Sequence, residues 1–364
     1  MNPSPSKHPQ IDREKRSLPK LLALDAPKNI LAILPNWLGD AAMCTPALRT
    51  LHQRFPDAEL TVAGPPAACA LVDGLPFISH AVPYAPRPGL LRLLRLGRAL
   101  RPYARDLTVV FPHSFRAAAI AKATGSRRIL AYGRNSRSWL VTDAVEPLMQ
   151  DGNIAPTYMA WEYLDLLDGL DCEYDGFGLQ LNADPMAVAR VKEHLVGPGP
   201  FVGFAPGAAF GDSKRWPVER FAETANRLAE EEGAQCVLLT GPGEEALRDT
   251  MLDAVRTPLI ICDEKRPTID TLKATISLLD LLIANDSGPR HVGVGFSIPT
   301  ICIMGPTEPV YTDSPYERGR VLRVDVDCGP CQRPTCRTDH RCMTEITPDD
   351  VVSAALAYLP KARV

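Results

Sequence analysis

Short apolar runs alternate along this chain with longer amphipathic stretches. The first half opens with an apolar run at Asn29–Leu34, a polar loop at Pro35–Asp40 and a helical pattern over about 41–55. A second apolar run follows at Glu59–Ala63. Apolar runs of this length between amphipathic helices are typical of parallel β-α-β units. The first half is therefore predicted to be a parallel sheet covered by helices.

The second half begins in the same way. An apolar run at Phe201–Ala205 leads into a glycine-rich loop over 206–216, a helical pattern over 218–232 and an apolar run at Cys236–Thr240. Three later apolar runs extend the two series: Leu107–Phe111, Leu281–Ala284 and Thr300–Met304. The pattern predicts an α/β protein of two doubly wound, Rossmann-like domains that face an interdomain cleft.

The domain boundary is expected in the polar stretch 168–200. We expect an N-terminal domain over 28–180 and a C-terminal domain over 181–364, each with its own sheet. Residues 1–27 are rich in Pro, Lys and Arg without an apolar core, so they indicate a disordered leader and not a secretion signal. No apolar run approaches the roughly 20 residues of a membrane span.

Charge is distributed unevenly. The 364 residues carry a net charge of −3, yet the stretch 74–142 holds twelve Lys and Arg and one acidic residue, Asp106. Such a basic region indicates an anionic partner or surface, although a solvated basic face without any partner stays an alternative. No nucleic-acid partner is expected.

One basic segment, residues 87–105, has helical periodicity. Its arginines recur every third residue at Arg92, Arg95, Arg98 and Arg101. A helix would direct Leu90, Leu91, Leu94 and Leu100 toward the other side. The segment fits a helix lying on an anionic membrane surface, and equally an ordinary surface helix whose leucines pack on the sheet.

Three loops follow predicted strands, where ligands bind in doubly wound sheets. In the first loop, Gly39 permits a tight turn and Asp40 stands at the start of a helix. Asp40 fits two roles, an N-cap or a general base that accepts a proton from a hydroxyl group. In the second loop, Gly207 and the small residues around it let backbone N–H groups approach an anion, and Lys214 adds positive charge.

The third loop has the sequence NDSGPRH at 285–291. Asp286 or Ser287 can cap the next helix, which leaves the N–H groups of Ser287 and Gly288 for a phosphate. His291 fits either a ligand contact or a packed residue of the first turn. No GxGxxG follows an early strand, which disfavours nicotinamide chemistry. The DVD sequence at 325–327 is interpreted as part of a strand and not as a metal site.

These loops together resemble glycosyltransferase family 9, the lipopolysaccharide heptosyltransferases. The segments that carry the resemblance are LPNWLGDAAMCTPALR at 34–49, PGAAFGDSKRWPVERFA at 206–222, LLTGPGEE at 238–245, IANDSGPRHVGVG at 283–295 and IMGPTEP at 303–309. The NWLGD form and the cysteine-bearing tail look most like the heptosyltransferase II branch.

The resemblance implies a GT-B fold and an inverting transfer of heptose from ADP-heptose to the lipopolysaccharide inner core, without a cofactor. It implies that Asp40 is the catalytic base and that Lys214 holds the diphosphate. The donor site would include Gly207, Ser213, Lys214, Glu244, Glu245, Asp286, Ser287, Gly288 and His291. The acceptor would contact Asn36, Trp37, Arg92 and Arg95.

The resemblance also places the protein in the cytoplasm, with peripheral contact at the inner face of the inner membrane, since the acceptor is an anionic lipid. One departure is Pro289-Arg290 after the DSG triplet, where Arg290 could add a phosphate contact. Two other classes stay open: a nucleotide-sugar epimerase on the same fold and a non-catalytic binder of sugar nucleotides.

Ten cysteines fall into two groups. Six are scattered in apolar stretches and indicate buried thiols in a reducing compartment. The other four, Cys328, Cys331, Cys336 and Cys342, are clustered in the loop 328–342 before a terminal helix capped by Thr347. Their spacing fits a structural zinc site, remote from sugar transfer. An iron–sulfur cluster, two disulfides and four unliganded thiols remain alternatives.

Overall fold

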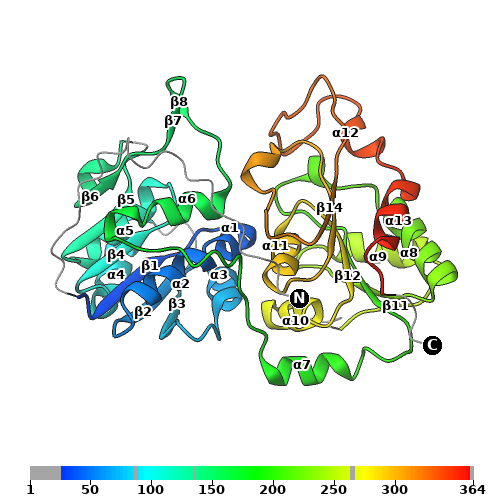
Figure 1. Ribbon diagram of the computed structural model, residues 1–364, viewed down its shortest axis with the longest axis horizontal. Coiled ribbons are helices and arrows are strands. Elements are labelled where there is room, and N and C mark those ends of the chain that lie inside the picture. Colours follow the sequence, from blue (N-terminus) through cyan, green and yellow to red (C-terminus); the bar gives the residue numbers. More distant parts are fainter. Residues whose placement is uncertain (1–25, 86–88, 135, 263–266, 361–364) are drawn as a thin grey trace. The chain divides into compact units, whose positions relative to one another are not determined.

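The chain forms two compact units, over residues 1–180 and 181–364. The computed structural model describes residues 26–85, 89–134, 136–262 and 267–360, so residues 1–25 of the predicted leader lie outside it. Each unit is built on its own six-stranded parallel sheet (Figure 1). The two doubly wound, Rossmann-like sheets predicted from the apolar runs are therefore present.

The sheet of the first unit has the strand order β3-β2-β1-β4-β5-β6. Its strands are β1 (Asn29–Ile33), β2 (Glu59–Gly64), β3 (His80–Pro83), β4 (Leu107–Val110), β5 (Arg128–Tyr132) and β6 (Asp143–Val145). A short antiparallel hairpin adds β7 (Met149–Gln150) and β8 (Asn153–Ile154). The central strands are buried on both faces because helices cover the sheet on each side, which explains their continuous apolar sequence.

Helices of the first unit are α1 (Leu38–Met43), α2 (Thr45–Arg54), α3 (Pro66–Val72), α4 (Leu90–Leu100), α5 (Phe115–Thr124) and α6 (Met159–Asp165). The expectation of a single helix over 41–55 is thus wrong, because the helix is interrupted at Cys44, between α1 and α2. Pro46 stands in the first turn of α2, where its missing N–H costs nothing. Asp40 is the third residue of α1, and Trp37 occupies the N-cap position.

The basic helix α4 packs closely on α5. A side chain at Gly97 would meet Cβ of Ala123 at 2.3 Å, so only glycine allows this approach. Leu93 and Leu100 are buried, whereas Leu94 is 45% exposed. The expectation that Leu94 faces the sheet is therefore wrong, and the close contact at Gly97 sets the rotation of the helix.

The sheet of the second unit repeats the order of the first, as β11-β10-β9-β12-β13-β14. Its strands are β9 (Phe201–Ala205), β10 (Gln235–Leu238), β11 (Leu259–Ile260), β12 (Leu281–Asn285), β13 (Thr300–Ile303) and β14 (Gly319–Leu322). Its helices are α7 (Pro185–Lys192), α8 (Val218–Glu232), α9 (Glu245–Ala254), α10 (Ile269–Ile276), α11 (Gly288–Gly295), α12 (Arg341–Thr344) and α13 (Pro348–Leu356).

The core of the second unit joins the tail of the chain to its first strand. Trp216 is fully buried against Phe221, and its indole N–H donates to the carbonyl of Ile346 at 3.0 Å. Helix α13 begins with the expected cap, since the Thr347 side chain accepts from the N–H of Asp350. Across both units, no helix in the described ranges is long and apolar enough to cross a membrane.

Candidate active site

The loops after β9 and β12 meet at one edge of the second sheet. These strands are neighbours and parallel, so their carboxyl ends lie together. Asn285, the last residue of β12, holds both loops. Its amide accepts from the N–H of Trp216 at 3.1 Å and donates to the carbonyl of Pro206 at 2.7 Å. Asn285 is buried and was not singled out from the sequence, although it opens the NDSG motif.

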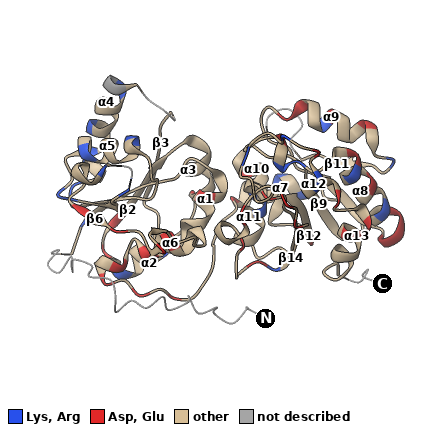
Figure 2. Ribbon diagram, turned by 90° about the horizontal axis from the view of Figure 1, so that it is seen from above, with Lys and Arg blue, Asp and Glu red and all other residues tan. Residues whose placement is uncertain are grey.

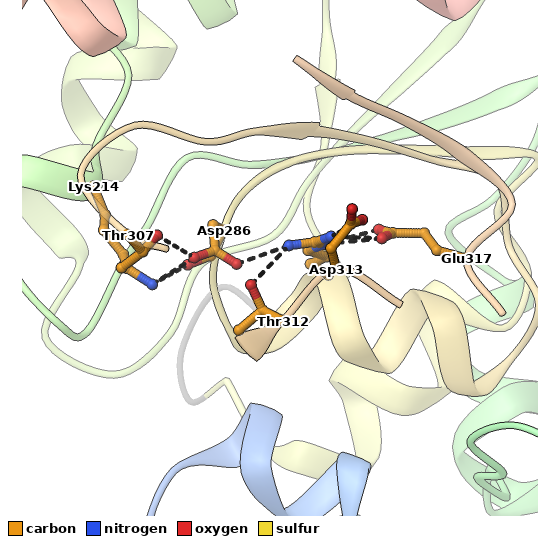
Figure 3. Close-up of polar contacts among 7 residues, drawn as sticks. Lys214, Asp286, Thr307, Thr312, Asp313 and Glu317 are labelled. Atoms are coloured by element: carbon orange, nitrogen blue, oxygen red, sulfur yellow. Dashed lines mark hydrogen bonds and ion pairs between the residues drawn. The ribbon is translucent and has the colours of Figure 1, made fainter. Parts of the chain in front are cut away.

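The two loops place Lys214 against Asp286 (Figure 3). The Lys214 ammonium donates to Asp286 Oδ2 at 2.6 Å and to the Asp286 carbonyl at 3.0 Å. Thr307, from the segment after β13, donates its hydroxyl to the same carboxylate at 2.7 Å. Both charged side chains are largely buried, with 12% and 2% of their side-chain areas exposed. The lysine is thereby fixed in one position by a carboxylate partner.

Arg290 completes the ionic network from the opposite side. Its guanidinium lies 2.9 Å from Asp286 Oδ1 and 2.6 Å from Glu317 Oε2, and its side chain is fully buried. Asp313 Oδ1 lies 3.7 Å from the same guanidinium, so Arg290 is occupied by three carboxylates, which is at odds with the phosphate contact suggested by its place after the DSG triplet. Burial alone would raise the pKa of Asp286, but Arg290 and Lys214 outweigh it and hold that pKa well below its usual range.

The start of helix α11 presents two buried polar atoms. Ser287 is its N-cap residue, yet the hydroxyl does not cap the helix as expected. Within the part of the chain that the structure describes, neither Ser287 Oγ nor His291 Nδ1 has a hydrogen-bond partner. Burial, with the positive charge of Arg290, lowers the pKa of His291 to about 3, so the imidazole is neutral. Both atoms are therefore available to hydrogen-bond to a ligand at the start of α11.

Glu244 lies directly against the glycine-rich loop. Its carboxylate accepts from the N–H of Gly241 at 2.7 Å, and a Cβ at Gly207 would stand only 2.0 Å from Oε1. Gly207 is therefore needed for close approach of the two loops. Glu245 accepts from the N–H of Gly243 at 3.2 Å. Of the two acidic residues expected at the donor site, Glu244 is the one in contact with the loop that carries Lys214.

In the first unit, Asp40 lies in the first turn of α1, immediately after β1. Burial raises the pKa of the Tyr163 phenol, and the negative charge of Asp40 raises it further. Asn36 and Trp37 are exposed in the loop before it, Trp37 to 55%.

A second charged group lies in the first unit and was missed from the sequence. Glu162 Oε1 is 2.9 Å from His113 Nε2 and 2.5 Å from the Arg134 guanidinium. His113 follows β4 and Arg134 follows β5, at the carboxyl end of the sheet where the Asp40 loop also begins. The available signal was His113, a polar residue soon after the predicted strand Leu107–Phe111, whereas the strand before Arg134 was not predicted. Arg92 and Arg95 are exposed on α4, and their role at an acceptor stays a prediction.

The four clustered cysteines are free thiols in this structure. The described residues contain no group of three or more His, Cys, Asp and Glu side chains arranged to hold a metal. Asp325 and Asp327 lie beyond the end of β14, so their assignment to a strand was wrong. Each pairs instead with an arginine, Arg323 and Arg341 respectively.

Two Rossmann-like sheets with charged residues in the loops after their first strands fit the architecture of nucleotide-sugar-dependent glycosyltransferases of the GT-B type. The chain belongs to glycosyltransferase family 9, because the model of "Glycosyltransferase family 9 (heptosyltransferase)" matches residues 93–341. The predicted family and enzyme class are thereby confirmed.

Relatives and solved structures agree with this assignment. The chain is 27% identical to lipopolysaccharide heptosyltransferase 2 of Escherichia coli K12, over 91% of this chain and 98% of the relative. It is 26% identical to lipooligosaccharide heptosyltransferase 2 of Campylobacter jejuni, with the same coverage. The structure of E. coli ADP-heptose LPS heptosyltransferase II superposes with a TM-score of 0.77 at 26% identity, covering 91% of this chain and 98% of that one.

Proposed function

We propose that this protein transfers heptose from ADP-heptose to the lipopolysaccharide inner core, with inversion at the anomeric carbon and without a metal ion. The main structural support for donor binding is the position of Lys214, which is held by Asp286 near two buried polar atoms at the start of α11. The names of the E. coli and C. jejuni relatives support the sugar and the acceptor.

The leaving diphosphate accounts for the arrangement around Lys214. As the bond between heptose and ADP breaks, negative charge grows on the diphosphate. Lys214 and the N–H groups at the start of α11 stabilise that charge without rearranging, since the lysine is already fixed by Asp286. Ser287 Oγ and His291 Nδ1 gain a partner in the donor. Asp286 then acts by positioning Lys214, because a carboxylate repels a phosphate.

Asp40 is proposed as the general base. The acceptor hydroxyl attacks the anomeric carbon from the face opposite ADP, and Asp40 takes the hydroxyl proton as the new bond forms. Asp40 lies in the first turn of α1 and is only partly buried, which supports this role. Glu244, in contact with the lysine-bearing loop, is proposed to bind the adenosine ribose.

Calorimetry with ADP-heptose, UDP-glucose and GDP-mannose, followed by a transfer assay on heptose-deficient lipopolysaccharide, tests this function. We expect binding of the ADP-sugar alone and a product larger by one heptose. Release or isomerisation of the sugar without acceptor would favour the epimerase. Tight binding with no turnover would favour a non-catalytic binder.

Membrane contact is proposed for the basic face of the first unit, with the protein in the cytoplasm. Lys and Arg are frequent on α4 and α5 (Figure 2). A pocket of about 540 Å³ opens beside the end of α4, lined by Arg98, Arg101, Pro102, Arg105, Gly125 and Arg127. The residues that line this pocket come just before β4 and β5 in the chain. The pocket therefore lies at the amino end of the first sheet, and the Asp40 loop lies at the carboxyl end. The charge complements anionic lipid headgroups.

Vesicle co-sedimentation tests this contact. We expect binding to phosphatidylglycerol vesicles and not to phosphatidylcholine vesicles, with a loss at high salt. The double change R101Q/R105Q should weaken binding, whereas Arg190→Gln, an exposed arginine of the second unit, should not. Equal binding by the double variant would contradict the assignment.

A structural zinc ion is proposed for the four clustered cysteines. Cys328 and Cys336 both contact the Thr338 hydroxyl, at 3.9 and 3.5 Å. Burial and the neighbouring thiols of the cluster raise the pKa of Cys342 to about 11. The thiols are thus neighbours that would have to turn toward one another to bind Zn²⁺. Elemental analysis of tag-free protein should find one zinc per chain, and freely titrating thiols without metal would exclude it.

A further inference from the structure

The cysteine-rich loop, residues 328–342, contacts the residue next to Lys214. Ser213 donates its backbone N–H to the carbonyl of Pro334 at 3.1 Å and its hydroxyl to the carbonyl of Arg333. The imidazole of His340 donates to the Ser213 carbonyl at 2.8 Å. All the polar groups of Ser213 are therefore held by this one loop, although the two segments are more than a hundred residues apart in sequence.

The backbone of the lysine loop is shaped for this contact. Gly211 has a φ of +152°, a conformation that residues with a side chain rarely adopt. A Cβ at Gly211 would lie 2.2 Å from the Pro334 carbonyl oxygen. Only glycine lets the two backbones approach this closely. The expectation that the cysteine-rich loop lies remote from the donor site is therefore wrong.

The same loop also contacts the segment that holds Asp286. Gln332 donates its backbone N–H to the carbonyl of Pro306 at 2.8 Å. The next residue, Thr307, donates its hydroxyl to Asp286. A side chain at Gly305 would collide with Met343 and approach the Cys342 thiol to 3.1 Å. The cysteine-rich loop thus contacts Ser213, which precedes Lys214, and Pro306, which precedes the Thr307 that binds Asp286.

We infer that the cysteine-rich loop positions the Lys214–Asp286 pair, with His340 as its positioning residue. The contact at Ser213 fixes the backbone from which Lys214 extends, and the contact at Pro306 fixes the backbone from which Thr307 reaches Asp286. A lysine displaced by even 1 Å would no longer meet the departing diphosphate in its best geometry. This inference rests on the proposed donor site.

Three variants of the full chain test the role of His340. His340→Ala removes the hydrogen bond to Ser213, and His340→Gln retains a donor of similar reach. His194→Ala is the matched control, since His194 is exposed in the same unit, after α7. For each, ADP affinity is measured by calorimetry and turnover of ADP-heptose is measured per folded molecule, both well below the melting temperature.

We expect His340→Ala to weaken ADP binding roughly threefold to tenfold, as for one lost neutral hydrogen bond. Turnover should fall at least about tenfold because Lys214 loses its alignment. His340→Gln should recover most of both, and His194→Ala should match the wild type. A lower melting temperature for His340→Ala with unchanged affinity and turnover would overturn the inference. A wild-type protein that neither binds ADP nor transfers heptose would overturn the proposed function and this inference with it.

Discussion

The loops after β1 and β9 occupy equivalent places in two sheets of the same strand order, yet they hold their charged residues differently. The first loop is short and places Asp40 in the first turn of a helix, where it is partly buried. The second loop is longer, and its Lys214 is largely buried, paired with Asp286 and bordered by the cysteine-rich loop.

The difference matches what each group has to do. A general base must meet a hydroxyl that arrives with a bulky acceptor, so it needs access more than rigidity. A cation that stabilises a leaving diphosphate acts best when it is already fixed before charge develops. The first loop therefore presents a partly buried carboxylate at the start of a helix, whereas Lys214 in the second loop is held within a network of buried partners.

Asp40→Asn should produce the largest loss of activity. Asparagine has nearly the same shape but cannot accept a proton, so turnover should fall by roughly 10² to 10⁴, the range for loss of general base catalysis. The melting temperature should change little, since Asp40 does not occupy the N-cap of α1. Turnover and thermal melts on one preparation check both points. Intact turnover per folded molecule would exclude Asp40 as the base.

Lys214→Ala should lower kcat by about 10², as for loss of one preorganised charge contact. It should also lower stability, because the buried carboxylate of Asp286 loses one of its two cations. The two loops then differ in a measurable way, since Asp40→Asn changes activity alone and Lys214→Ala changes both. Unchanged kcat and kcat/KM in Lys214→Ala would show that the diphosphate is held elsewhere.

Most of the fold could be predicted from the sequence, because buried parallel strands leave continuous apolar runs. Strands such as Phe201–Ala205 and the helix over 218–232 stand where the pattern places them. The break at Cys44 was missed, although Pro46 was the available signal: a proline at the sixth position of a continuous helix over 41–55 would disrupt it, whereas a new helix that begins at Thr45 tolerates it. The rotation of α4 about its axis depends on the close approach of Gly97 to Ala123. Ala123 belongs to another helix, so the sequence periodicity of α4 does not reveal this contact.

The site was only partly predictable. Lys214 and Asp286 stand out as charged residues after strands, and the structure pairs them. Their supports come from distant segments: Thr307 follows β13, and Glu317 precedes β14. Such partners depend on which backbone segments lie side by side, which a single sequence does not reveal. The contact of His340 with Ser213 is of the same kind.

Asp286→Asn should have a smaller effect on turnover, about tenfold, because Lys214 stays present but loses its alignment. Its main effect is on stability, with a loss of about 3 to 5 kcal/mol on removing one partner of a buried ion pair. Arg290 and Lys214 depress the pKa of Asp286 below its unfolded value of about 3.9, so its contribution is complete above that pH and declines as pH falls further. Urea unfolding at pH 6, 4 and 3 should show a decline in the wild type that is weaker in the variant. Parallel declines would contradict the ionised pair.

Removal of divalent metal should have the smallest effect, none on the transfer step. In the proposed mechanism Lys214 and the helix-start N–H groups take the place of a metal at the leaving diphosphate, so activity should persist in EDTA during a short assay. Full loss with recovery on Mg²⁺ or Mn²⁺ would overturn the metal-independent mechanism.

A slow loss of activity in EDTA, with recovery on Zn²⁺ alone, would have another cause. It would indicate release of a metal from the cysteine-rich loop and displacement of Ser213 beside Lys214. The His340→Ala variant separates these outcomes: its Lys214 is already misaligned, so a Zn²⁺-dependent loss should be smaller in it, whereas a Mg²⁺-dependent loss should be the same as in the wild type.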